Sequence, residues 1–218
     1  MDLPDLWVRA VTVVDELGRR LAPLGWTLDQ FEEDDFAGFV RPHDAGISFY
    51  LGVSLAPPDQ ELSLEPSVGV GHVEVARLSA EFLGVPAAGG MTGTTLDTLR
   101  RAATPAADGT ERWTVYRPGD EAQEAAVAER VVEDLLRYGE PYLAERSSLP
   151  DIVARMSAGP RNQLDEAYLA IAYALLGDRA AAERSLAVVE RPARPLLAGG
   201  SAERFVERFR RHFDLTGA

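Results

Sequence analysis

The stretch EAYLAIAYALLGDRAAAERSLAVVE, residues 166–190, decides what the C-terminal part of this chain can form. Apolar and small residues recur at three- and four-residue spacing on both sides of Gly177, which is typical of two amphipathic helices. A glycine permits the tight turn between them because it accepts left-handed backbone angles. The stretch therefore predicts a helical hairpin, with helices near 162–176 and 179–190.

The hairpin resembles a tetratricopeptide repeat, in which small and large residues at fixed offsets let two helices pack closely. It covers about one repeat, with Glu166 where the repeat has Trp and with Pro195 one place late. A repeat scaffold needs about three stacked units, and neither 120–138 nor 201–214 continues the pattern. We therefore expect one docked hairpin and not a solenoid. The residues at matching spacing are Leu169, Ala170, Tyr173, Gly177, Ala182 and Leu186.

Upstream of the hairpin the pattern changes from helix to strand and back to helix. Residues 5–22 carry apolar side chains at helical spacing, and 26–55 hold aromatic and β-branched clusters separated by turn residues. The expected antiparallel strands are 26–32, 36–41 and 46–55, with 61–64 as a candidate fourth and 111–117 returning to the sheet. We expect one helix closed by Gly84 and one at 120–138 that Gly139 and Pro141 end. Two more helices are expected after the caps Ser148 and Ser201. The region 85–110 is expected to be loop with a short element at TLDTLRR.

These patterns predict an α+β fold. A leading helix packs on a small antiparallel sheet in 1–118, and 119–218 is an all-helical half that contains the one tetratricopeptide-like hairpin. No polar flexible linker separates residues 117 and 120, so we expect both regions to pack together as one continuous domain.

The composition limits the chemistry. Cysteine is absent, which excludes disulfides, thiolate metal sites and a cysteine nucleophile. All 22 basic residues are arginine, so Schiff-base chemistry and a lysine-bearing phosphate loop are excluded as well. The 35 acidic residues give a net charge of −13, which disfavours nucleic acid and anionic membranes and favours a basic protein partner. Solubility alone is the competing explanation of that charge.

The N-terminal sequence MDLPDLWVRA lacks the basic start and apolar core of a signal peptide. No apolar run in the chain is long enough to span a bilayer. We therefore expect a cytoplasmic protein that does not enter membranes.

No motif predicts a catalytic, cofactor or metal site. His72 and Glu74 form an H-x-E pair, but at the start of a helix their side chains diverge and no third ligand is near in sequence. His43 falls in an expected turn, and His212 lies among arginines on the last helix. GGMTGTT at 89–95 lacks the lysine and the preceding strand of a phosphate loop.

An acidic run joins the first two expected strands. Four consecutive acids at a hairpin tip usually face water, where they can contact a basic partner. The predicted partner-binding residues are Glu32, Glu33, Asp34 and Asp35.

Between residues 5 and 155 several segments follow one another in a characteristic order: FAGFVRP, ISFYLGVSL, LEPSVGVGHVEVARLSAEFLG, ERWTVYR, then LLRYGEPYL and LPDIV. This order resembles uncharacterised bacterial families of actinobacterial type, several of which occur as immunity proteins of polymorphic toxin systems. The resemblance implies a non-enzymatic protein that acts by binding, in its sharpest form an inhibitor of a basic toxin. Two alternatives stay open: an enzyme or small-molecule binder whose site assembles from distant residues, and a structural or self-associating module.

Overall fold

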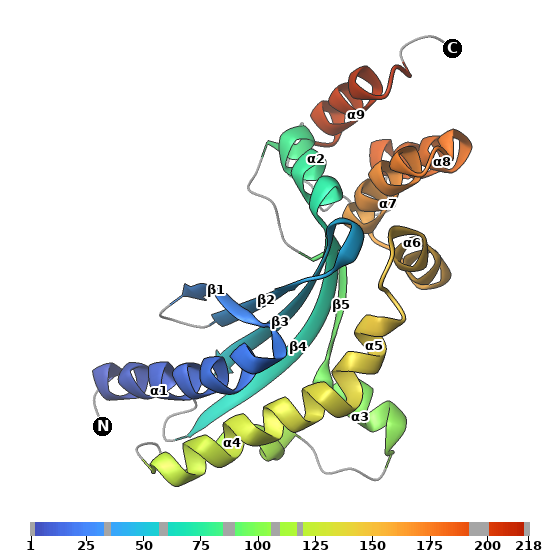
Figure 1. Ribbon diagram of the computed structural model, residues 1–218. Coiled ribbons are helices and arrows are strands. Elements are labelled where there is room, and N and C mark those ends of the chain that lie inside the picture. Colours follow the sequence, from blue (N-terminus) through green and yellow to red (C-terminus); the bar gives the residue numbers. More distant parts are fainter. Residues whose placement is uncertain are drawn as a thin grey trace. The chain divides into compact units, whose positions relative to one another are not determined.

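The computed structural model describes residues 3–32, 36–56, 61–84, 90–105, 110–116, 120–191 and 201–215 (Figure 1). Two compact units share the chain, and each is assembled from three separate stretches. The first unit comprises Met1–His43, Phe49–Gly69 and Gly93–Glu145, and the second comprises Asp44–Ser48, Val70–Thr92 and Arg146–Ala218. That 1–118 and 119–218 pack as one continuous domain stays a prediction.

An antiparallel sheet forms the centre of the first unit, as the sequence predicts. Its strands lie in the order β1-β2-β3-β4-β5, and β6 pairs with β4. The first two strands pair with Thr27 opposite Val40, and a bulge interrupts the register between Leu28 and Gln30. The strands are β1 (Thr27–Glu32), β2 (Phe36–Pro42), β3 (Ile47–Ala56), β4 (Leu62–His72), β5 (Thr92–Thr95) and β6 (Thr114–Val115).

Two long helices of this unit, α1 and α4, pack against each other. The inner face of α1 is fully buried at Val13, Leu17 and Leu21. Gly18 faces the sheet, and a Cβ there would make an ordinary van der Waals contact of 3.8 Å with the ring of Phe39 in β2. The helices of the first unit are α1 (Leu3–Leu21), α3 (Leu96–Ala103), α4 (Glu121–Asp134) and α5 (Glu140–Ala144), with 3-10 turns at Ala22–Leu24 and Thr110–Trp113.

The prediction that Gly139 and Pro141 end the helix begun near residue 120 is wrong. The chain continues from α4 through a π-helical turn, Leu135–Gly139, into α5. Pro141 occupies the first turn of α5, directly after the π-helical turn, in which the N–H of Glu140 donates to the carbonyl oxygen of Leu135. Gly139 is required by packing, because a Cβ would lie 2.8 Å from Leu135 Cδ1 and 3.2 Å from Leu96 Cδ2.

The strand predicted at 111–117 is much shorter in the structure. Within the described part of this segment, 111–116, Thr114–Val115 pairs with the sheet through Leu62 and Ser63 of β4. The preceding residues form the 3-10 turn, because the side chains of Arg112 and Trp113 both bond to Asp134 of α4. In the region 85–110, the short element expected at TLDTLRR is found as α3, whereas β5 lies where loop was predicted.

Five helices make up most of the second unit, and the predicted hairpin is confirmed as α7 and α8. Gly177 connects them with a left-handed φ of 79°. Asn162 caps α7 through the backbone N–H groups of Leu164 and Asp165. Helix α2 packs on α7 and α9. The helices are α2 (Val73–Leu83), α6 (Leu149–Ala158), α7 (Gln163–Leu175), α8 (Arg179–Glu190) and α9 (Ser201–His212), with a 3-10 turn at Asp44–Gly46.

The α+β class with an N-terminal helix and a helical C-terminal half is thus confirmed. Within the described stretches, none of the helices has the length and apolarity that crossing a bilayer requires.

Candidate functional site

The net charge of the chain belongs entirely to the first unit. Its three stretches contain 23 acidic and 10 basic residues, which gives −13. The second unit contains 12 acidic and 12 basic residues, which gives zero. Any long-range attraction of a basic molecule therefore originates in the unit that contains the sheet.

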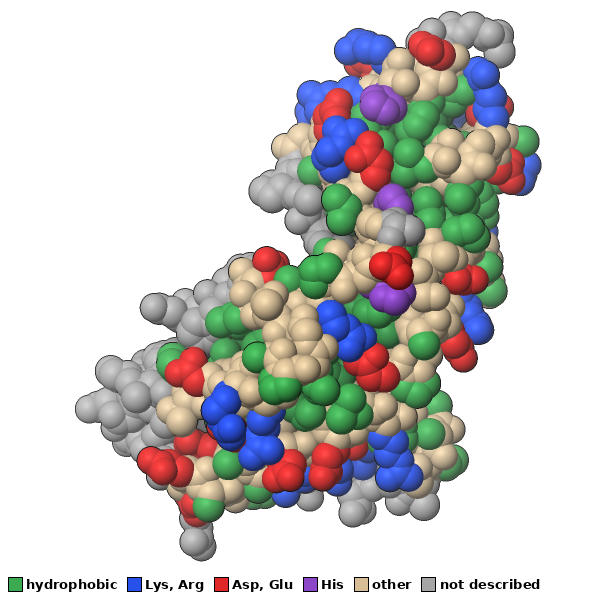
Figure 2. Space-filling view, in the orientation of Figure 1, with side chains coloured by type: hydrophobic (Ala, Val, Ile, Leu, Met, Phe, Trp, Pro, Cys, Tyr) green, Lys and Arg blue, Asp and Glu red, His purple; other side chains and the backbone are tan. Residues whose placement is uncertain are grey.

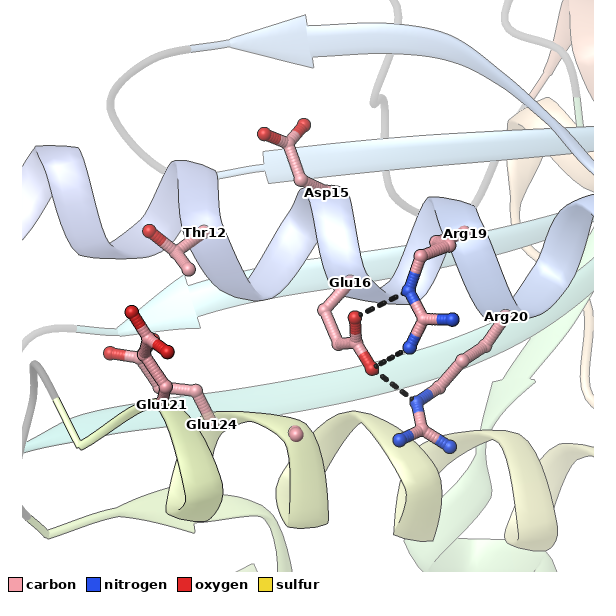
Figure 3. Close-up of a pocket in the computed structure, with 8 residues that line it drawn as sticks. Thr12, Asp15, Glu16, Arg19, Arg20, Glu121 and Glu124 are labelled. Carbon is pink, nitrogen blue, oxygen red and sulfur yellow. Dashed lines mark hydrogen bonds and ion pairs between the residues drawn. The ribbon is translucent and has the colours of Figure 1, made fainter.

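A pocket of about 450 Å³ opens between α1 and α4 of this acidic unit (Figure 3). Helix α1 contributes residues from its second half, and α4 contributes residues from its first turns. Four carboxylates and two guanidinium groups line the pocket: Asp15, Glu16, Glu121, Glu124, Arg19 and Arg20, together with Thr12 and Ala125.

Both arginines are held by one carboxylate. Arg19 donates to Glu16 through Nε at 2.8 Å and through Nη2 at 2.6 Å, and Arg20 donates through Nε at 2.7 Å. The hydrogen bonds from Arg19, joined by the bond and charge of Arg20, lower the pKa of Glu16 from 4.5 to about 2. Glu16 stays ionised at physiological pH and compensates part of the positive charge on this side of the pocket.

The other carboxylates lie at the opposite end. Glu121 and Glu124 rise from the first turn of α4 toward Thr12 on α1, whereas Asp15 points away from them (Figure 3). The positive end of the α4 dipole favours acids at this position. Glu124 is buried with 3% of its surface exposed, while Glu121 and Asp15 are exposed. No ion pair joins Asp15 or Glu121 to a side chain in the described ranges.

Carboxylates accept hydrogen bonds and donate none when ionised, so this end of the pocket suits a cationic side chain. An arginine fork is the best geometric match, because it can bond two carboxylate oxygens at once. No group of three or more His, Asp or Glu side chains is placed to hold a metal ion among the residues whose positions are described.

The predicted acidic run lies almost wholly outside the described residues. Glu32 ends β1, where its backbone pairs with Phe36 of β2. Its side chain, and all of Glu33, Asp34 and Asp35, are outside the described part of the chain. Their role in partner binding stays a prediction.

The three histidines lie in different places. His43 stacks on Phe49 with ring centroids 4.7 Å apart. His72 ends β4, directly before α2, and His212 ends α9. Sequence reasoning did not find the α1–α4 pocket because its two halves are far apart in the chain. The one local signal was the acidic first turn of α4.

Comparisons of this chain with protein-family models, with curated proteins and with solved structures find no match. The charge and geometry of the chain itself are therefore the basis for a proposed function. The resemblance to immunity-protein families remains a prediction.

Proposed function

We propose that this chain is a non-enzymatic protein-binding protein whose acidic unit contacts a basic protein partner. The observation that supports the proposal is the confinement of the whole charge of −13 to the first unit. A charge of one sign on one unit steers an oppositely charged partner and raises the rate of association. In its sharpest form the protein is an immunity-type inhibitor of a basic toxin.

The α1–α4 pocket is the proposed anchor for an arginine or lysine side chain of that partner. Glu121 has no ion pair among the described side chains, so a partner cation gains its interaction without displacing an existing bond. The arginines of the pocket do not compete, because Glu16 already holds them. Exposed acids elsewhere on the unit contribute to the rate of encounter more than to the lifetime of the complex.

The test begins with capture of partners from a lysate of the native organism, followed by elution with rising salt. We expect a basic protein whose affinity and association rate fall as salt screens the charges. The captured protein is then purified and its binding kinetics are measured with variants. Glu121→Gln should weaken binding about 1.5-fold to fivefold, the range for loss of one exposed ion pair.

The matched control is Glu203→Gln, which removes one exposed acid from α9 of the neutral unit. It changes the net charge by the same amount as Glu121→Gln and should leave binding unchanged. Binding that is insensitive to salt, or equal weakening by both variants, would refute the assignment to the acidic unit.

A further inference from the structure

The second unit contains a pocket of opposite character. It has a volume of about 390 Å³ and lies between α2 and α9. Three of its four lining residues have basic side chains: Arg208, Arg211 and His212 of α9. The fourth is Glu81 of α2. Figure 2 shows basic side chains gathered over α2 and α9, with acidic ones between them.

Arg208 is fixed in place by the end of α2. Its Nη1 donates a hydrogen bond to the backbone carbonyl oxygen of Glu81 in the last turn of that helix. The same Nη1 lies beside the helix cap, since a Cβ at Gly84 would be 3.6 Å from it. No carboxylate of the described chain forms an ion pair with Arg208, so its charge is not neutralised locally.

His212 is also held in position. Its ring meets Phe82 edge-on with centroids 5.5 Å apart and meets Phe213 with centroids 4.7 Å apart. Arg211 is anchored one turn back by Glu207, whose Oε1 lies 2.6 Å from Nη2. The three basic groups thus face one hollow, and each is restrained by a different contact.

The one acid of the pocket already has a cationic partner, which it shares with a second acid. Glu81 Oε2 lies 3.0 Å from Nη1 of Arg77, which also pairs with Glu74. The unit as a whole is neutral, so no net negative charge opposes an approaching anion. Two guanidinium groups and one carboxylate line the pocket, and Arg208 is the guanidinium group that has no carboxylate partner among the described side chains.

We propose that the α2–α9 pocket binds the phosphate group of a small molecule. Guanidinium groups bond phosphate oxygens in pairs, and the tetrahedral group offers acceptors to donors on several sides at once. Arg208 and Arg211 supply the charge, and His212 supplies a ring N–H that is rigidly placed by the phenylalanines. The contact differs in place and in sign from the proposed partner interface, so either can fail without the other.

Inorganic phosphate is the probe. The full chain, labelled for NMR, is titrated with phosphate at constant ionic strength maintained by chloride, and the signals of His212 and of the arginine Nε–H groups are followed. We expect a saturable shift confined to His212, Arg208 and Arg211, with a dissociation constant on the order of millimolar for so small an anion. Acetate, a planar monoanion, should bind about tenfold more weakly.

Three variants distinguish the pocket from general attraction to arginines. Arg211→Gln should weaken phosphate binding about tenfold, the loss of a charge-assisted hydrogen bond. Arg204→Gln removes an exposed arginine of α9 that bonds Ser201 and does not line the pocket, and it should change nothing. Glu81→Gln should tighten binding, a gain that misfolding cannot mimic.

Shifts of equal size with chloride alone, equal effects of the two arginine variants, or no gain with Glu81→Gln would overturn the proposal. Equal affinity for acetate and phosphate would also overturn it, because the pocket would then be a carboxylate site. If all three variants bound phosphate with the affinity of the wild type, the binding site would lie elsewhere in the chain.

Discussion

The buried carboxylate of Asp134 should contribute more to the stability of the first unit than any exposed acid of that unit does. Only 4% of its side chain is exposed. Its carboxylate accepts hydrogen bonds from Nε of Arg112 at 2.6 Å and from Nη2 of the same residue at 3.2 Å. It also accepts a hydrogen bond from the indole Nε1 of Trp113 at 3.1 Å. One side chain of α4 thereby fixes the turn that leads into β6.

The cost of removing it follows from these contacts. Asp134→Ala leaves the indole N–H of Trp113 buried without an acceptor, which costs about 1–3 kcal/mol. The loss of the ion pair adds up to about 1 kcal/mol, because Arg112 is one-third exposed and water screens its charge. We expect a total of about 1–4 kcal/mol. Asp134→Asn retains an acceptor oxygen and should cost about 1–2 kcal/mol.

The adjacent residue Glu133 is a built-in control. It lies 3.5 Å from the same arginine but is 61% exposed, so Glu133→Ala should change stability by less than about 0.5 kcal/mol. The three tryptophans of the chain, Trp7, Trp26 and Trp113, all belong to the first unit. Urea unfolding followed by tryptophan fluorescence therefore reports on that unit alone. If Asp134→Ala costs no more than Glu133→Ala, the reasoning from burial is wrong.

The same assay should show that Gly139→Ala destabilises by about 1–3 kcal/mol through overpacking, whereas Gly18→Ala in α1 stabilises by about 0.5–1 kcal/mol because its Cβ has room; opposite signs would contradict the packing. The lowered pKa of Glu16 gives stability that is complete above its unfolded pKa of 4.5 and is lost as the pH falls toward about 2. The difference in unfolding free energy between wild type and Glu16→Gln should therefore shrink across that range, and a constant difference would exclude the ion pair as its cause. Burial raises the pKa of Tyr168 above 10.0, so the stability linked to it is present below pH 10.0 and is lost as the pH rises further. Tyr168→Phe should remove this alkaline dependence, as measured by circular dichroism at rising pH.

The elements that the sequence predicted well are those with a local pattern. The first two strands, expected at 26–32 and 36–41, are found at Thr27–Glu32 and Phe36–Pro42. The aromatic and β-branched clusters, with turn residues between them, were sufficient to predict these two strands. The α7–α8 hairpin was equally clear, because Gly177 divides two periodic segments.

The elements that the sequence missed depend on contacts between distant residues. Strand β4 was expected to stop at residue 64 but runs to His72, although Pro66 and two glycines interrupt its pattern. Strand β5 lies in a glycine-rich stretch that looked like a loop. Its Gly93 comes so close to the neighbouring strand that a Cβ would lie 2.9 Å from the carbonyl oxygen of Val68. A glycine required by a tertiary contact cannot be distinguished from a loop glycine by its neighbours in sequence.

The separation of charge was hidden for the same reason. Divided at residue 118, the chain carries 18 acidic and 9 basic residues before the division, and 17 acidic and 13 basic residues after it. The charges of −9 and −4 suggest an acidic surface throughout. Divided by the compact units they become −13 and zero, because the acidic stretch 120–145 joins the first unit through α4.

This separation bears on why the chain is acidic. Charges of one sign that are concentrated on one unit repel each other and so destabilise that unit. If the charge served solubility alone, we would expect acids on both units, since spreading them lowers that cost. The second unit instead balances 12 acids with 12 arginines, six of which lie on α8 and α9. Such a distribution is expected when one unit must attract a basic surface and the other must not repel an anion, which are the two interactions proposed for the α1–α4 and α2–α9 pockets.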